Sequence, residues 1–141
     1  MVRKLKSKIE RKLPIVINNE DRILVLHELR KDTKKLRYLI ELVTKRDYER
    51  AGERSTGDEG SDEQLGENHN RILRQLEKIQ GMLGEIHDYD VTIDYLNQHR
   101  LSKSSLISDI IENMINVRKK RFNEFVDYNK QTNLDVKCIL K

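Results

Sequence analysis

Residues that break helices are scarce in this chain, which has six glycines and one proline in 141 residues. Average usage of these two residues together is about 12% of a chain, more than twice the fraction found here. Turn-rich β-sandwiches and barrels need many such residues, whereas a few long helices do not. No alternation of apolar and polar residues is long enough to predict a strand. The chain is therefore predicted to be all-α.

Apolar periodicity and capping residues predict a helical bundle of three long helices plus a short N-terminal helix. The short basic helix covers residues 2–12 and is expected to end at Pro14, because proline breaks the hydrogen-bond ladder of a helix. The long helices are expected over about 18–50, 65–99 and 102–132. The length fits a single domain over residues 1–141.

Residues 51–64 form the one low-complexity segment, and we expect a flexible acidic loop there. The segment holds five acidic residues against one arginine, a net charge of −4. The whole chain carries +4, so the remaining residues carry +8. A basic helical body of this kind points to a polyanionic partner.

Other features of the composition predict a cytoplasmic protein without a membrane partner. Cys138 is the single cysteine, so no intramolecular disulfide is expected. No apolar run approaches the roughly 20 residues that span a bilayer. The N-terminus also lacks the apolar stretch of a secretory signal.

The helix expected over residues 18–50 carries a cationic stripe. At about 100° per residue, one face of this helix is rich in cations and the opposite face is apolar. The members of the first face are His27, Arg30, Lys31, Lys34, Arg37, Tyr38 and Lys45. The opposite face holds Leu29, Leu36, Ile40 and Val43. From His27 to Lys45 is roughly 27 Å of helix, which suits a linear polyanion better than a single phosphate. A solvated basic face is the alternative interpretation.

Two arginines of the last helix lie on or beside its apolar stripe, which is expected to comprise Ile107, Ile111, Met114, Ile115, Phe122 and Phe125. Arg118 and Arg121 need an anion or an acidic partner there, because an unpaired buried charge is costly. A bound polyanion and buried pairs with Glu or Asp both satisfy this requirement.

Residues 81–91 contain a mid-helix glycine and an adjacent His–Asp pair. Gly84 costs about 1 kcal/mol relative to alanine, so we expect it to permit a close helix crossing. His87 and Asp88 invite a metal-site interpretation, but no other histidine has a matching spacing. We favour a structural role in which Asp88 or Asp90 binds an Arg or Lys of a neighbouring helix.

Two motifs of this chain resemble the CHAD family, which is named for a histidine in an α-helical domain. The first is Leu26-His27-Glu28-Leu29-Arg30 followed by Lys34-Lys35-Leu36-Arg37-Tyr38. The second is Leu76-x-x-Ile79-Gln80-x-x-Leu83-Gly84-x-x-His87-Asp88. The resemblance implies a helical module that binds inorganic polyphosphate through a basic surface and is not itself an enzyme. Its implied anion-binding residues are His27, Arg30, Lys34 and Arg37, joined by Lys31 from the same stripe and by Arg118 and Arg121.

The chain departs from the family in one respect, because members usually contain two such helical repeats and only one is present here. We therefore expect a homodimer in which two chains replace the two repeats. The contact is expected at apolar positions near Leu101–Ile111.

Non-catalytic binding of polyphosphate is the function that we expect, with no catalytic residue, cofactor or metal. The first alternative is a helical nucleic-acid-binding protein, although the chain has few aromatic residues for stacking on bases and no helix-turn-helix motif. The second is a metal-dependent phosphohydrolase that uses His87 and Asp88. No Gly-rich phosphate loop or nucleophile motif accompanies that pair.

Overall fold

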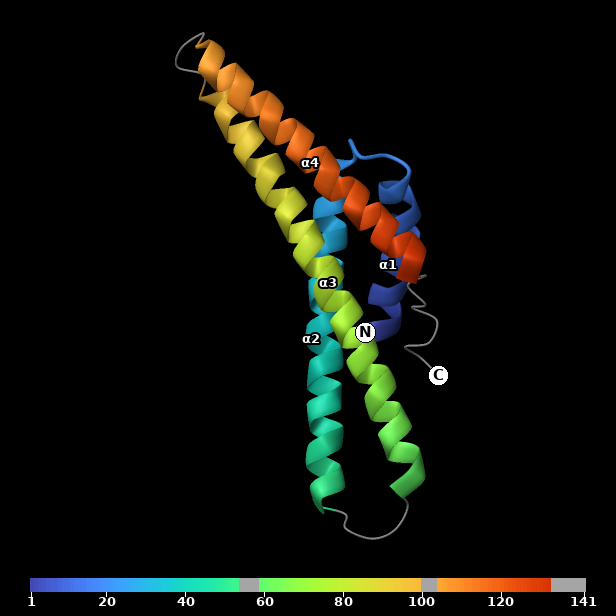
Figure 1. Ribbon diagram of the computed structural model, residues 1–141. Helices are drawn as coiled ribbons and strands as arrows, with labels where there is room; N and C mark the ends of the chain where they lie inside the picture. The colour runs from blue at the N-terminus through green and yellow to red at the C-terminus, as the bar shows by residue number, and fades with distance from the viewer. Residues whose placement is uncertain (54–58, 100–103, 133–141) are drawn as a thin grey trace.

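Four α-helices and their connections make up the computed structural model, which confirms the all-α prediction (Figure 1). It describes residues 1–53, 59–99 and 104–132, without the side chains of residue 48 and residues 51–65. The helices are α1 (Val2–Ile17), α2 (Ile23–Glu53), α3 (Glu59–Gln98) and α4 (Ser105–Thr132). One short helix and three long ones were expected, and this arrangement is confirmed.

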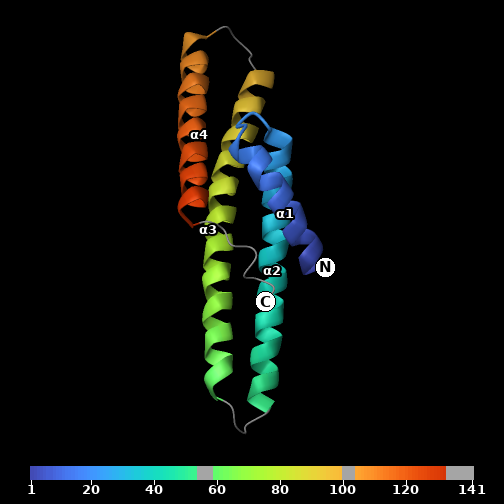
Figure 2. The same cartoon turned by 90° about the vertical axis from the view of Figure 1, so that its right-hand side faces the viewer.

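Each helix packs on the next in the chain, which gives an elongated molecule. The contacts between helices join α1 to α2, α2 to α3 and α3 to α4. Figure 2 shows this order across the molecule, with α2 and α3 as the long central hairpin. The first part of α2 lies beside α1, and the last part of α3 lies beside α4 (Figures 1 and 2). The α2–α3 pair therefore extends beyond α1 and α4 at one end of the molecule, and the α3–α4 pair extends beyond α1 and α2 at the other.

The core is built from the apolar stripes of all four helices. On α3 the buried stripe follows the helical repeat and consists of Ile72, Leu76, Ile79, Leu83 and Ile86. The other buried members of the cluster are Leu5, Ile9, Val16, Leu26, Leu29, Leu36, Ile40, Phe122 and Phe125. These residues join α1, α2 and α4 to the central helix.

The ends of the predicted apolar stripes are more exposed than expected. Val43 on α2 is 48% exposed, and Ile115 on α4 is 47% exposed. Both were expected in the core. At one end of the molecule α2 and α3 pack on each other alone, and at the other end α3 and α4 do (Figure 2). A pair of helices covers only one side of each helix and leaves the rest exposed. Helical periodicity predicts which face is apolar, but not how far along the helix a neighbour covers it.

The prediction that Pro14 ends the first helix is wrong, because α1 continues to Ile17 with Pro14 inside it. The Asn18 N–H donates to the Pro14 carbonyl oxygen over 3.2 Å and closes the last turn. The extra turn buries Val16 completely, on the same side as Leu5 and Ile9. Proline disfavours the helix interior by about 3 kcal/mol, and burial of the extra apolar turn offsets part of that cost.

The acidic loop expected over residues 51–64 is also shorter than predicted. Helix α2 ends at Glu53 and α3 begins at Glu59, so both helices extend into this segment. Residues 54–58 lie outside the described part of the chain.

In the helices that the structure describes, there is no segment with the length and apolar character needed to cross a bilayer.

Replacing Leu36 with alanine should destabilise the protein strongly, because the Leu36 side chain is completely buried between the helices. The expected loss in free energy of unfolding is about 2–5 kcal/mol. The matched control is Leu42→Ala on the same helix, since Leu42 is 64% exposed and should change stability little. Urea unfolding followed by circular dichroism measures both variants, and equal losses would contradict the assigned face of α2.

Candidate anion-binding site

The two sequence motifs meet where α2 packs against α3. The imidazole rings of His27 and His87 lie with centroids 4.6 Å apart and planes tilted by 33°. One helical turn away, Arg30 crosses Gly84, and a Cβ atom at Gly84 would lie 3.9 Å from Arg30 Nε. The register of the hairpin thus places His27 and Arg30 of the first motif beside His87 and Gly84 of the second.

Gly84 does not have the role expected from the sequence. A Cβ at this position would make an ordinary contact with the Arg30 side chain, and it would meet no backbone of another helix within 4 Å. A close crossing of two backbones therefore does not require a glycine here. The missing side chain instead leaves space beside the Arg30 guanidinium.

His27 and Arg30 are half-buried at the edge of the α2–α3 contact, not on a fully exposed face opposite the core. His27 Nδ1 and Arg30 Nε are buried atoms without a hydrogen-bond partner in the structure. Among the described residues, no carboxylate lies within 4.0 Å of the Arg30 side chain. Buried polar groups in folded proteins nearly always have a partner, so these two nitrogens are well suited to an anion or ordered water.

The exposed cations of α2 continue from this point along the helix. Lys31 and Lys34 are exposed, and in the described part of the chain neither has a carboxylate within ion-pair distance. The Tyr38 ring supports two cations, since Lys34 Nζ and Arg37 Cζ lie 5.8 and 4.9 Å from its centroid.

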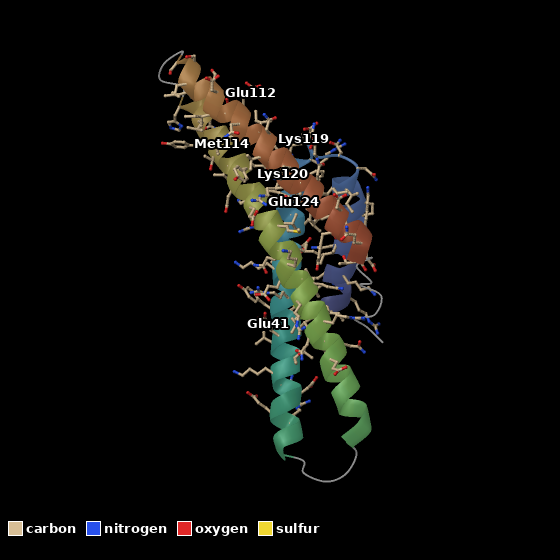
Figure 3. All side chains as sticks on the ribbon, in the orientation of Figure 1. Glu41, Glu112, Met114, Lys119, Lys120 and Glu124 are labelled. Atoms are coloured by element: carbon tan, nitrogen blue, oxygen red, sulfur yellow. The ribbon has the colours of Figure 1, made fainter. Side chains whose placement is uncertain are left out.

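In the described part of the chain, Arg37 is the member of this row that has a carboxylate within ion-pair distance. Its Nε lies 3.3 Å from Glu41 Oε1, although the N–H does not point at the carboxylate and makes no hydrogen bond. Glu41, labelled on α2 in Figure 3, is exposed. The pair is therefore accessible to water and open to exchange with another anion.

The acidic residues of this part of α2 are turned toward α1. Lys12 Nζ lies 2.8 Å from Glu28 Oε2 and 2.8 Å from Asp32 Oδ2. The hydrogen bond from Lys12 lowers the pKa of Glu28 and so favours its charged form. Lys12 draws both acids toward α1, so the opposite edge of α2 carries cations, with Glu41 beside Arg37 at its far end. We call this edge the α2 cationic surface, formed by His27, Arg30, Lys31, Lys34 and Arg37.

Arg118 lies apart from this surface and has a structural role. Its Nε donates to Asp90 Oδ1 over 2.9 Å, and its Nη2 donates to the Glu20 carbonyl oxygen over 2.9 Å. Only 9% of its side chain is exposed. The prediction that Asp90 binds a cation of a neighbouring helix is confirmed. Of the two partners left open for Arg118, the structure shows the buried acid. Its guanidinium is bonded in the interior, so Arg118 is removed from the candidate anion-binding residues.

Arg121 faces the groove between α3 and α4 instead of α2. Its Nη1 donates to Glu124 Oε2 over 2.9 Å, and its Nε lies 3.3 Å from Glu85 Oε2. A shallow pocket of about 350 Å³ opens here, lined by Glu85, Asp88, Tyr89, Thr92, Met114 and Arg121. Met114 and Glu124 are labelled along α4 in Figure 3. Acidic side chains surround this arginine, so the structure does not join it to the α2 cationic surface.

His87 and Asp88 point to different grooves. The His87 ring lies against His27 of α2, whereas Asp88 lines the pocket between α3 and α4. Adjacent residues of a helix do not face each other, so these two side chains do not converge on one point as ligands of a single metal would. In the part of the chain that the structure describes, no group of three or more His, Cys, Asp or Glu could hold a metal ion.

The sequence analysis singled out His87 together with Asp88, and it did not predict the contact with His27. Its role beside His27 depends on the register between α2 and α3, which the periodicity of either helix alone does not fix. The available signal was the second motif, in which Gly84 and His87 follow each other at a spacing of one turn.

Burial and nearby charges disfavour the charged form of His27 in the free protein. Burial lowers the pKa of His27, and the nearby charges of Lys31, His87 and Arg30 lower it further. Each of these effects disfavours the imidazolium form. A negative charge at the same place would act in the opposite direction.

Comparisons with known proteins add no relative. No protein-family model matches the chain, and neither a curated protein nor a solved structure is significantly similar to it.

Removing the Arg118 guanidinium should destabilise the fold, because Asp90 would remain in the interior without its ion-pair partner. For Arg118→Ala we expect a loss of about 3–5 kcal/mol in the free energy of unfolding. Arg121→Ala serves as the matched control, since it removes the same group from an exposed pair worth up to about 1 kcal/mol. Chemical denaturation of both variants measures the difference. Similar small losses in both would contradict the structural role of Arg118.

Proposed function

We propose that this chain binds inorganic polyphosphate, a linear polyanion, without catalysis and through the α2 cationic surface. The observation that carries the proposal is the pair of buried, unpartnered nitrogens, His27 Nδ1 and Arg30 Nε, next to the exposed Lys31 and Lys34. Hydrogen bonds to charged groups are stronger than neutral ones, so an anion that reaches these nitrogens would be a strong partner for them. The resemblance to the CHAD family supports the same ligand.

A polymer uses this surface better than a single phosphate does. The positions from His27 to Arg37 extend along about 15 Å of helix. One phosphate group would reach the partly buried end, at His27 and Arg30. A chain with a charge at each repeat would continue past Lys31 and Lys34 to Arg37 and would release counterions along its length.

Polyphosphate suits the surface better than nucleic acid. Tight binding of single strands uses aromatic side chains on which bases stack. The aromatic residue within this row is Tyr38, and Lys34 and Arg37 already lie over its ring. Stacking of bases would therefore add little to the binding free energy here, whereas phosphate groups would be attracted by every cation of the surface.

The homodimer and the cytoplasmic location stay predictions. Leu106 and Ile110, in the segment expected to form the dimer contact, are 65% and 45% exposed. Their exposure supports a contact at this end of α4. Leu101 of the same segment lies outside the described residues.

The double variant Arg30→Gln/Lys34→Gln should bind long-chain polyphosphate about ten- to a hundredfold more weakly, because it removes two charged contacts. The slope of log affinity against log salt should also become shallower, by about 0.7–0.9 for each lost phosphate contact. The control is Lys8→Gln/Arg11→Gln, which removes one lysine and one arginine from exposed positions one turn apart on α1. Fluorescence titration at several salt concentrations measures all three proteins.

The same titration with duplex DNA of equal phosphate content separates the two polymers. We expect polyphosphate to bind more tightly than DNA. DNA binding that equals or exceeds polyphosphate binding would contradict the proposed ligand. An equal loss of affinity in the α1 and α2 variants would show that net charge, not the α2 cationic surface, attracts the polymer.

A further inference from the structure

Two histidines in contact at a cationic site form a group whose charge depends on pH. His27 and His87 are both half-buried, and their rings lie 4.6 Å apart. Ordinary histidines titrate at about pH 6.5, close to the pH of the cell. Positive charge on His87, Lys31 or Arg30 therefore opposes a proton on His27.

The charges around the pair come from its own helices first. On α2, Arg30 and Lys31 repel a proton on His27, and the adjacent Glu28 attracts it more weakly. On α3, Asp90 follows His87 by nearly one turn, but it is bonded to an arginine of α4. Asp88, adjacent to His87, lines the pocket between α3 and α4 instead. At His27 the effect of the cations exceeds that of Glu28.

The flanking helices do not change this balance. From α1, Lys12 reaches α2 and is bonded by Glu28 and Asp32. From α4, Arg118 and Arg121 face α3, and each has a carboxylate partner of its own. Among the described residues, no carboxylate lies within ion-pair distance of His27 or His87.

We propose that the His27–His87 pair takes up protons when polyphosphate binds, so that the affinity of this site for the polymer increases as the pH falls. This inference rests on the proposed function. Phosphate charges beside the rings stabilise the imidazolium form, and each protonated ring then offers N–H donors to the phosphate oxygens. His27 Nδ1, which has no partner in the free protein, is one of these donors.

Linkage makes the coupling measurable in both directions. If the polymer favours protonation, protonation must favour the polymer by the same factor. Affinity can change up to about tenfold per pH unit for each proton taken up, and the pair supplies at most two. In the free protein, protonation acts against folding. Because the pKa of His27 is lowered by folding, protonation of this residue reduces stability as the pH falls below about 6.5.

The direct test is calorimetric titration of the full chain with long-chain polyphosphate, from about pH 8.5 to 5.5 at constant ionic strength. Repeating it near about pH 6.5 in two buffers of different ionisation enthalpy counts the protons taken up, with no need for a variant. We expect net proton uptake and an affinity that rises at least about tenfold between pH 8 and pH 6. The internal phosphates of a long chain remain ionised over this range, so the polymer itself contributes little.

The double variant His27→Gln/His87→Gln should lose most of the pH dependence while keeping salt-dependent binding through the lysines. The matched control is His99→Gln near the end of α3. His99 also stacks on an aromatic ring, that of Tyr95, with centroids 4.2 Å apart, but it lies outside the proposed site. This control should retain the full pH dependence.

The outcomes separate the inference from the function on which it rests. Salt-dependent binding with no proton uptake would overturn the inference and leave polyphosphate binding intact. An unchanged pH dependence in the double histidine variant would also overturn it. Absence of binding at every pH would overturn the proposed function itself, and the inference with it.

Discussion

The packing of one apolar stripe of α2 against α3 determines most of what this molecule presents to solvent. Leu29 and Leu36 on α2 and Leu83 and Ile86 on α3 are buried in the same cluster. Once these side chains interlock, the register between the two helices is fixed. The same register brings His27 to His87 and Arg30 to Gly84 at the edge of the contact. The candidate site is therefore a consequence of the core.

Pairing of acids elsewhere gives this edge its charge. Lys12 of α1 forms ion pairs with Glu28 and Asp32, and Arg118 of α4 forms one with Asp90. These pairs hold α1 and α4 to the central hairpin, and they also remove the carboxylates that would otherwise neutralise neighbouring cations. A net charge of only +4 can thus produce a locally cationic surface. The separation of cations from acids is a property of the fold, and it cannot be read from the net charge of the chain.

Features set within one helix were predictable from the sequence, whereas features that depend on neighbouring helices were not. The buried stripe from Ile72 to Ile86 follows the helical periodicity of α3, and Asp90 was one of two residues expected to bind a cation of a neighbouring helix. The end of α1 was predicted wrongly, and the partner of Arg118 was left open between a polyanion and a buried acid, for one reason. Burial of Val16 against the other helices stabilises the turn of α1 that follows Pro14. The ion pair with Asp90 of α3 holds the Arg118 side chain in the interior. The contact of His27 with His87 required the register, which only the packed hairpin supplies.

The central claim is that polyphosphate binds at the edge where α2 meets α3, and an NMR titration of the full chain tests it most directly. With histidine and arginine side chains isotopically labelled, long-chain polyphosphate should shift the signals of His27, His87 and Arg30. The signals of His99 and of Arg118, which is bonded to Asp90 in the interior, should stay unchanged. Shifts confined to Arg3 and Arg11 of α1, with His27 and His87 unaffected, would contradict the account.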